Sequence, residues 1–127
     1  MKCRIFGNYW RGGLELRGRS GFFTTAMTPF AGIIEVDDNG RFKGAISDKI
    51  GEADVQGEIS GAALQFEKIY SIVNPGQTPG TGISYLLQGS ATNGIHGGWW
   101  GIYTQDGEEQ DSPRGQATCT IHPDPNE

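Results

Sequence analysis

The strongest constraint on the fold of this chain is an alternation of apolar and polar residues through three consecutive segments of residues 41–70. The positions between the members of one face are mostly charged, amide-bearing or glycine. A period of two residues with one apolar face is typical of antiparallel strands that cover a core, and no helix of ordinary length fits it. The pattern therefore predicts an all-β protein. The shared face consists of Phe42, Ile46, Asp48, Ala53, Val55, Ile59, Leu64, Phe66, Lys68 and Tyr70.

The turn at Asp38-Asn39-Gly40 predicts how the first of these segments pairs with the segment before it. Its composition is that of a three-residue hairpin loop in which the glycine adopts a positive φ. This loop length sets Val36 opposite Phe42 and Glu35 opposite Lys43, so that apolar meets apolar and opposite charges meet. A loop one residue shorter would place a carboxylate opposite Phe42, and we therefore reject it.

A second hairpin is expected at Ser60-Gly61, which would place Val55 opposite Phe66. Thr28-Pro29 is expected to interrupt pairing, because proline has no N–H for the ladder. Consecutive hairpins without a crossover helix predict an up-and-down antiparallel meander barrel of about eight strands rather than a sandwich. The expected strands cover residues 14–17, 22–27, 31–37, 41–47, 50–59, 63–70, 83–91, 95–104 and 115–121.

Length and composition limit the class of protein. A chain of 127 residues is long enough for one domain with a sizeable core, expected at residues 1–121 with a polar C-terminal tail at 122–127. The formal charge of −5 argues against a nucleic-acid partner. No apolar run follows Met1 or is long enough to span a membrane, so we expect a cytoplasmic protein without a membrane partner. Cys3 and Cys119 are in phase with apolar neighbours and are expected to be free, buried thiols.

An aromatic residue near the start of the chain, Trp10 in the segment GNYWRGG, adds a resemblance to a known architecture. Together with the strand number and the meander order, it makes the chain resemble the calycin type of small barrel, shared by lipocalins, fatty-acid-binding proteins and avidin-like proteins. Gly7 and Trp10 are one residue further apart than in the Gly-x-Trp of lipocalins, and the three tryptophans do not follow the avidin-like pattern, so biotin binding does not carry over. The resemblance implies a ligand cup at one mouth of the barrel.

Inward-facing aromatic rings and one pair of charges form the candidate ligand site. Asp48 and Lys68 share the inward phase of apolar neighbours, and an unpaired buried charge is costly, so they are expected to pair or to reach water at the strand ends. Trp99 and Tyr103 are assigned inward, because glycines on the same face leave room for their rings. The expected ligand-binding residues are Phe42, Asp48, Phe66, Lys68, Tyr70, Tyr85, Trp99 and Tyr103.

Trp100 and Ile102 occupy the opposite face of the same strand and are candidates for an interface. One interpretation is a protein contact or a homodimer patch. The other is burial under the first segment or under the loop at residues 73–82.

Two functions from different classes fit these patterns. The first is non-enzymatic binding of a small apolar or aromatic molecule in the cup of the barrel. The alternative is a protein-interaction or homodimer module whose barrel is fully packed and holds no ligand. Catalysis by Asp48 with Lys68 or His96 is the least favoured, since no set of nucleophile, base and orienting group is visible. The two histidines, His96 and His122, are too few to indicate a metal site, and no cofactor is expected.

Overall fold

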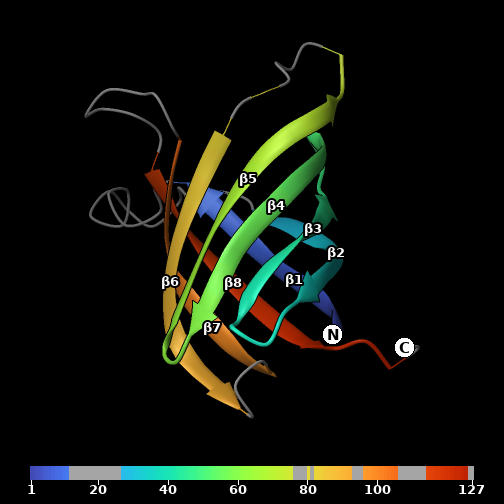
Figure 1. The fold of residues 1–127 in the computed structure, drawn as a ribbon. Coiled ribbons are helices and arrows are strands. Elements are labelled where there is room, and N and C mark those ends of the chain that lie inside the picture. The colour runs from blue at the N-terminus through green and yellow to red at the C-terminus, as the bar shows by residue number, and fades with distance from the viewer. Residues whose placement is uncertain (12–26, 76–79, 81, 93–95, 106–113, 126–127) are drawn as a thin grey trace, which may run out of the picture.

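The computed structural model describes residues 1–11, 27–75, 80, 82–92, 96–105 and 114–125, and these residues form eight antiparallel strands. The strands follow one another in chain order around a closed barrel, and β8 returns to pair with β1 (Figure 1). The predicted all-β, up-and-down barrel is therefore confirmed. The described residues include no helix that is long and apolar enough to cross a membrane. The strands are β1 (Lys2–Arg11), β2 (Thr28–Val36), β3 (Arg41–Ser47), β4 (Gly51–Ser60), β5 (Ala63–Val73), β6 (Gly82–Thr92), β7 (His96–Gln105) and β8 (Arg114–Pro123).

Side chains alternate between the inside and the outside of the barrel as the period of two predicts. On β7, Trp99 and Tyr103 are buried, whereas Trp100 and Ile102 are exposed. The predicted assignment of these two pairs to opposite faces is confirmed. The buried apolar residues of all eight strands belong to one continuous core inside the barrel.

The β2–β3 hairpin has the predicted register. Val36 lies opposite Phe42 and Glu35 opposite Lys43, and Gly40 has a φ of 83°. Glu35 and Lys43 do not form an ion pair, however, although they face each other. The Glu35 carboxylate instead lies 3.4 Å from the amino group of Met1.

Gly40→Ala is expected to destabilise the protein more than Gly61→Ala. Both glycines have left-handed φ values, 83° and 58°, where a non-glycine residue costs roughly 1–2 kcal/mol. At Gly40 a Cβ would also lie 2.4 Å from the carbonyl oxygen of Ile59, whereas at Gly61 it would meet open space. The extra strain should lower the free energy of unfolding by at least about 1 kcal/mol more at Gly40. Denaturant unfolding of the two variants measures this difference, and equal losses would contradict the steric argument.

The β4–β5 hairpin departs from the predicted register by two residues. Val55 lies opposite Lys68 and not Phe66, because the turn is formed by the two residues after Ser60 rather than by Ser60-Gly61. Gly61 supplies the left-handed conformation that a two-residue hairpin turn needs at its first central position. A shift of two residues leaves every side chain on its predicted face, so the inward set is unchanged.

The predicted interruption at Thr28-Pro29 is wrong. β2 begins at Thr28, and Pro29 lies opposite Asn8 of β1. Pairing between β2 and β3 begins only at Ala31. Pro29 therefore has a neighbouring strand on one side only, an edge position at which proline is tolerated.

The closing strand extends beyond the expected boundary at residue 121. β8 runs to Pro123, which pairs with Cys3 of β1. Asp124 is buried, and its carboxylate lies 3.8 Å from Nζ of Lys2 and 3.4 Å from Nε of Arg4. Residues 122–124 belong to the barrel rather than to a tail, and the two termini lie near each other (Figure 1).

Two further expectations concern the first strands and the thiols. The predicted strand at 14–17 and most of that at 22–27 lie outside the described residues. Glycines at positions 7, 12 and 13 favour at most a short strand before Gly7, but β1 continues through Gly7 to Arg11. Cys3 and Cys119 are both buried and free, as predicted.

Candidate functional site

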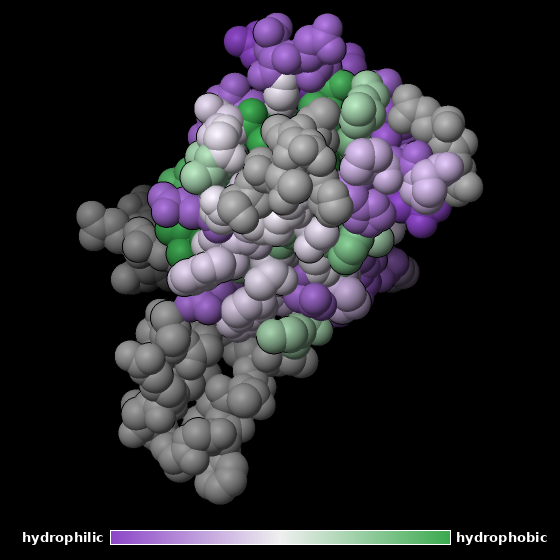
Figure 2. Space-filling model, turned by 90° about the horizontal axis from the view of Figure 1, so that it is seen from below, coloured by the Kyte–Doolittle hydropathy of each residue, from purple (hydrophilic) through white to green (hydrophobic). Residues whose placement is uncertain are grey.

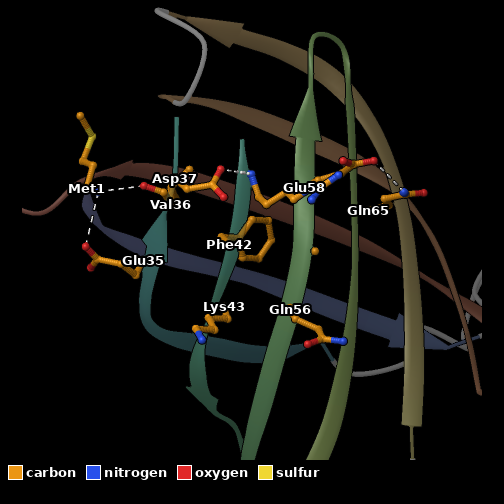
Figure 3. A pocket seen from close by; sticks show the side chains of 11 residues that line it. Met1, Glu35, Val36, Asp37, Phe42, Lys43, Gln56, Glu58 and Gln65 are labelled. Carbon is orange, nitrogen blue, oxygen red and sulfur yellow. Dashed lines mark hydrogen bonds and ion pairs between the residues drawn. The ribbon is translucent and has the colours of Figure 1, made fainter. Parts of the chain in front are cut away.

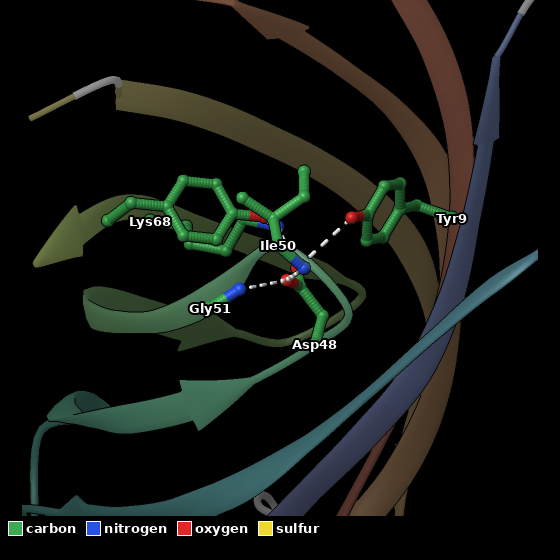
Figure 4. A network of polar contacts seen from close by, with 6 residues as sticks. Tyr9, Asp48, Ile50, Gly51 and Lys68 are labelled. Atoms are coloured by element: carbon green, nitrogen blue, oxygen red, sulfur yellow. Dashed lines mark hydrogen bonds and ion pairs between the residues drawn. The ribbon is translucent and has the colours of Figure 1, made fainter. Parts of the chain in front are cut away.

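A buried ion pair lies inside the barrel near the end where β3 connects to β4 (Figure 4). Asp48 follows the last residue of β3, and its side chain is 1% exposed. Lys68 on β5 is 0% exposed, and its Nζ lies 3.2 Å from Oδ2 of Asp48. The predicted pairing of these charges is confirmed, whereas the alternative that both reach water is wrong.

The Asp48 carboxylate is saturated with hydrogen-bond donors. Its Oδ1 accepts from the backbone N–H groups of Ile50 at 2.8 Å and Gly51 at 3.3 Å. In addition to the lysine ammonium, its Oδ2 accepts from the hydroxyls of Tyr9, at 3.1 Å, and Tyr70. The network thus joins β1, the β3–β4 connection and β5. A carboxylate with this many donors has little capacity left for a ligand.

The environment of the network fixes its charge state. Burial alone would raise the pKa of Asp48, but the hydrogen bond from Tyr70 and the charge of Lys68 outweigh it and hold this pKa below its ordinary value of 3.8. Burial lowers the pKa of Lys68, and the Asp48 charge opposes that effect. Burial also raises the pKa of Tyr9 to about 12 and that of Tyr70 higher still. At neutral pH the carboxylate is ionised and both phenols are neutral.

Aromatic rings enclose the Lys68 ammonium. Its Nζ lies 4.4 Å from the ring centroid of Tyr9, 4.9 Å from that of Tyr70 and 5.3 Å from that of Tyr85. Cation–π attraction at such distances adds to the ion pair when water is excluded. The cation is therefore held by the protein's own rings and carboxylate.

Rings from opposite walls meet in the middle of the barrel. Phe30 on β2 lies 6.3 Å from Tyr85 on β6, and Tyr85 lies 5.7 Å from Tyr103. Tyr103 contacts Tyr9 at 5.7 Å, and Tyr9 closes the circuit with Phe30 at 6.4 Å. Phe66 stacks on Tyr85 at 4.4 Å. At this level side chains fill the interior, as an eight-stranded barrel allows.

Two buried polar atoms inside the barrel lack a hydrogen-bond partner among the described residues. They are the hydroxyl of Tyr85 and Nε1 of Trp99. Burial raises the pKa of Tyr85 well above its ordinary value of 10.0. Most buried polar groups in proteins are paired, so an unpaired hydroxyl carries an energetic penalty that substitution can measure.

A groove of about 640 Å³ crosses the barrel wall near the β2–β3 hairpin (Figure 3). Its apolar part is formed by Val36, Phe42 and Gly57, and most of its other lining comes from outward-facing positions of β2–β5. Gly57 lies between the Phe42 and Phe66 positions in the register. The residues around the apolar part are Met1, Glu35, Asp37, Arg41, Lys43, Gln56, Glu58 and Gln65.

The carboxylates of this groove are engaged. Glu35 contacts the amino group of Met1. Asp37 accepts from the backbone N–H groups of Asn39 in the hairpin loop and Arg41 at the start of β3, and Glu58 accepts from Nε2 of Gln65 at 3.2 Å.

The cations of the same groove are available. Among the described residues, Arg41 and Lys43 form no ion pair, although each lies opposite a glutamate in the register. The groove therefore combines an apolar part with two positive charges that have no carboxylate partner.

The predicted site residues are thus split between different surroundings. Asp48, Lys68 and Tyr70 meet in the polar network, and the predicted rings are all buried inside the barrel. Only Phe42 lines the groove of 640 Å³. A second cavity of about 420 Å³, on the wall of β5–β7, is lined in part by Phe66 and Tyr85. Whether these side chains contact a ligand stays a prediction.

Sequence reasoning missed two contributions. Tyr9 donates to Asp48, and its inward phase with Cys3 and Ile5 would have placed it inside if β1 had been expected to continue past Gly7. The predicted hairpin register sets Lys43 opposite Glu35 and Arg41 opposite Asp37, and nothing in the pattern of alternation distinguishes a paired from an unpaired surface cation.

In the part of the chain that the structure describes, no cluster of three or more His, Cys, Asp or Glu side chains is arranged to hold a metal ion. His122 lies on β8, where its ring packs edge-on against Phe6 at 5.4 Å, and the His96 side chain lies outside the described part. Comparison with family models, curated proteins and solved structures finds no match to this chain.

Proposed function

We propose that this protein is a non-enzymatic binding protein, and that its ligand is a small molecule with an aromatic or apolar body and one negative group. The proposed site is the groove near the β2–β3 hairpin, with Phe42 contributing to its apolar part and Arg41 and Lys43 facing the anion. The main observation behind this proposal is that the carboxylates of the groove already form hydrogen bonds or an ion pair, whereas Arg41 and Lys43 have no carboxylate partner. The apolar or aromatic body is the ligand expected from the sequence, whereas the negative group and the position of the site on the wall rather than in the cup are new.

The size and composition of the groove support this proposal. A volume of about 640 Å³ lies within the range of roughly 300–1,000 Å³ that is usual for small-molecule sites. Such sites usually combine an apolar lining with a few polar groups that orient the ligand. Strand number and strand order also resemble those of calycin barrels, and this architecture favours a binding role by analogy alone.

The polar network gives the interior less support as the binding site. Asp48 and Lys68 would have to release partners that are already in place before they could hold a ligand group. Breaking such a buried pair is costly. We assign the network to holding the barrel together, and the groove to binding.

Two dyes that differ by one charged group test the proposal. Anilinonaphthalene sulfonate carries the aromatic body and the anion, whereas phenylnaphthylamine carries the same rings without the sulfonate. We expect saturable binding of both, measured by fluorescence titration. Arg41→Ala and Lys43→Ala should each weaken sulfonate binding by roughly two- to fivefold, the range of an exposed charge pair, and should leave phenylnaphthylamine binding unchanged.

Lys49→Ala is the matched control, because Lys49 is an exposed lysine in the β3–β4 connection, away from the groove lining. It should change the binding of neither dye. Thermal unfolding of each variant checks that the barrel is as stable as in the wild type, because a partly unfolded barrel would bind the dyes at exposed apolar surface. An equal loss of sulfonate binding in Lys49→Ala and Lys43→Ala, or no binding by the folded protein, would refute the assignment of the groove.

A further inference from the structure

The outer face of β6, β7 and β8 differs from the rest of the barrel in carrying almost no charge. The only Asp, Glu, Lys or Arg in these three strands is Arg114, the first residue of β8. By contrast, β3, β4 and β5 each contain at least two charged residues. We call the following outward-facing residues the neutral face: Ser84, Leu86, Gln88, Trp100, Ile102, Thr104, Gln116, Thr118 and Thr120.

Three large apolar side chains stand exposed on the neutral face. Trp100 is 64% exposed, Leu86 53% and Ile102 50%. Leu86 and Ile102 lie directly opposite each other on β6 and β7, and Trp100 follows two positions away along β7. Viewed from below, hydrophobic residues are visible on more than one side of the molecule, including the side where β6 lies (Figure 2). Aromatic enrichment and depletion of charge are typical of the centre of a protein interface.

A cavity lies beside Trp100 on the same face. It measures about 420 Å³, and Leu86, Ile102 and Thr104 contribute to its lining, together with Gln65, Phe66 and the charged residue Glu67 of β5. Trp100 is not part of that lining. Along β7, Ile102 therefore stands between a projecting indole and a hollow.

We propose that the neutral face is an interface between two copies of this chain, in which Trp100 of each copy enters the cavity of the other. Trp100 and the cavity lie on opposite sides of Ile102 along β7. A two-fold axis that passes near Ile102 therefore places the indole of each copy over the cavity of the other, and both contacts form in the same closed dimer. A face that meets its own copy must not repel itself. The residues of the neutral face carry no charge, in a protein whose formal charge is −5, and Glu67 is the charged residue that the cavity lining adds to the contact.

The mass of the particle in solution tests this interface. Light scattering from micromolar to near-millimolar concentration should show that the wild-type protein forms a closed dimer. The dissociation constant of this dimer should rise by at least about tenfold in Trp100→Ala and in Ile102→Gln, because central interface residues contribute most of the binding energy. Ile72→Gln is the matched control, because Ile72 on β5 is 62% exposed and lies off the neutral face. It should leave the dimer intact.

Two further variants test the charge argument and the two-fold arrangement. Thr118→Glu, beside Trp100 in the register, should weaken the dimer by at least about tenfold, because it places an unpaired carboxylate in the interface. Ile102→Cys should form a disulfide with its own copy on oxidation, and Ile72→Cys should not.

A wild-type monomer at all concentrations would overturn the proposal, and so would a dimer that Trp100→Ala and Ile102→Gln leave unchanged. A mass that keeps growing with concentration would overturn the two-fold arrangement, since open-ended contacts build chains. These measurements of mass do not involve the groove near the β2–β3 hairpin, so the dye-binding test can succeed or fail independently of them.

Discussion

Asp48→Asn is expected to lower the free energy of unfolding by about 3–5 kcal/mol, because it leaves the buried Lys68 ammonium without its counter-charge. Asparagine keeps the size of the side chain but removes the negative charge that Lys68 and both tyrosine hydroxyls face. For a chain of this length the loss corresponds to a decrease in Tm of about 10 °C or more. Thermal and denaturant unfolding at neutral pH measure it.

The double variant Asp48→Asn/Lys68→Met provides the control. Replacing the orphaned lysine by an apolar residue of similar length should restore a substantial part of the lost stability, because a buried pair removed as a whole costs far less than one broken in half. A double variant that is as unstable as Asp48→Asn alone would show that the ion pair is not what the substitution disrupts.

The effect of Asp48→Asn should also depend on pH in a defined direction. The pKa of Asp48 is lowered in the folded protein, so its stabilising contribution is complete above the ordinary value of 3.8 and is lost as pH falls through the lowered pKa. The difference in Tm between wild type and Asp48→Asn should therefore narrow in strong acid. A gap that widens as pH falls would contradict the direction of the shift.

Tyr85→Phe and Tyr70→Phe should change stability in opposite directions. The Tyr85 hydroxyl is buried without a hydrogen-bond partner among the described residues, and removing such a group relieves a penalty of about 1–3 kcal/mol. The Tyr70 hydroxyl donates to the Asp48 carboxylate, and its loss should cost about 1.5–3 kcal/mol, the range for a hydrogen bond to a charged group. Denaturant unfolding of the two variants against wild type gives both signs.

The paired design makes the result of Tyr85→Phe informative. Both substitutions remove one hydroxyl from a buried tyrosine inside the barrel, so differences in side-chain volume cancel. If Tyr85→Phe destabilises the protein as much as Tyr70→Phe does, its hydroxyl has a partner in solution, and an ordered water in the interior is the simplest one.

The local pattern of the sequence determined the fold class and the facing of the side chains. Alternation over residues 41–70 predicts which residues point inward, and a register error of two residues in the β4–β5 hairpin did not change this prediction, because facing repeats every two residues. The same phase placed Asp48 and Lys68 inside, and the glycines on the face of Trp99 and Tyr103 assigned Trp100 to the outside. The cost of burying an unpaired charge then required that the two charges meet.

Tertiary structure alone decided which inward residues touch and where the wall is hollow. Tyr9 reaches Asp48 because the curved wall of the barrel brings β1 across the interior from the β3–β4 connection, and Phe30 of β2 meets Tyr85 of β6 across the interior for the same reason. The groove beside Phe42 and the hollow beside Ile102 depend on how side chains of several strands pack together. A one-dimensional pattern records the direction of each side chain but not the distances across a closed barrel, and those distances determine which charges are satisfied and which remain available.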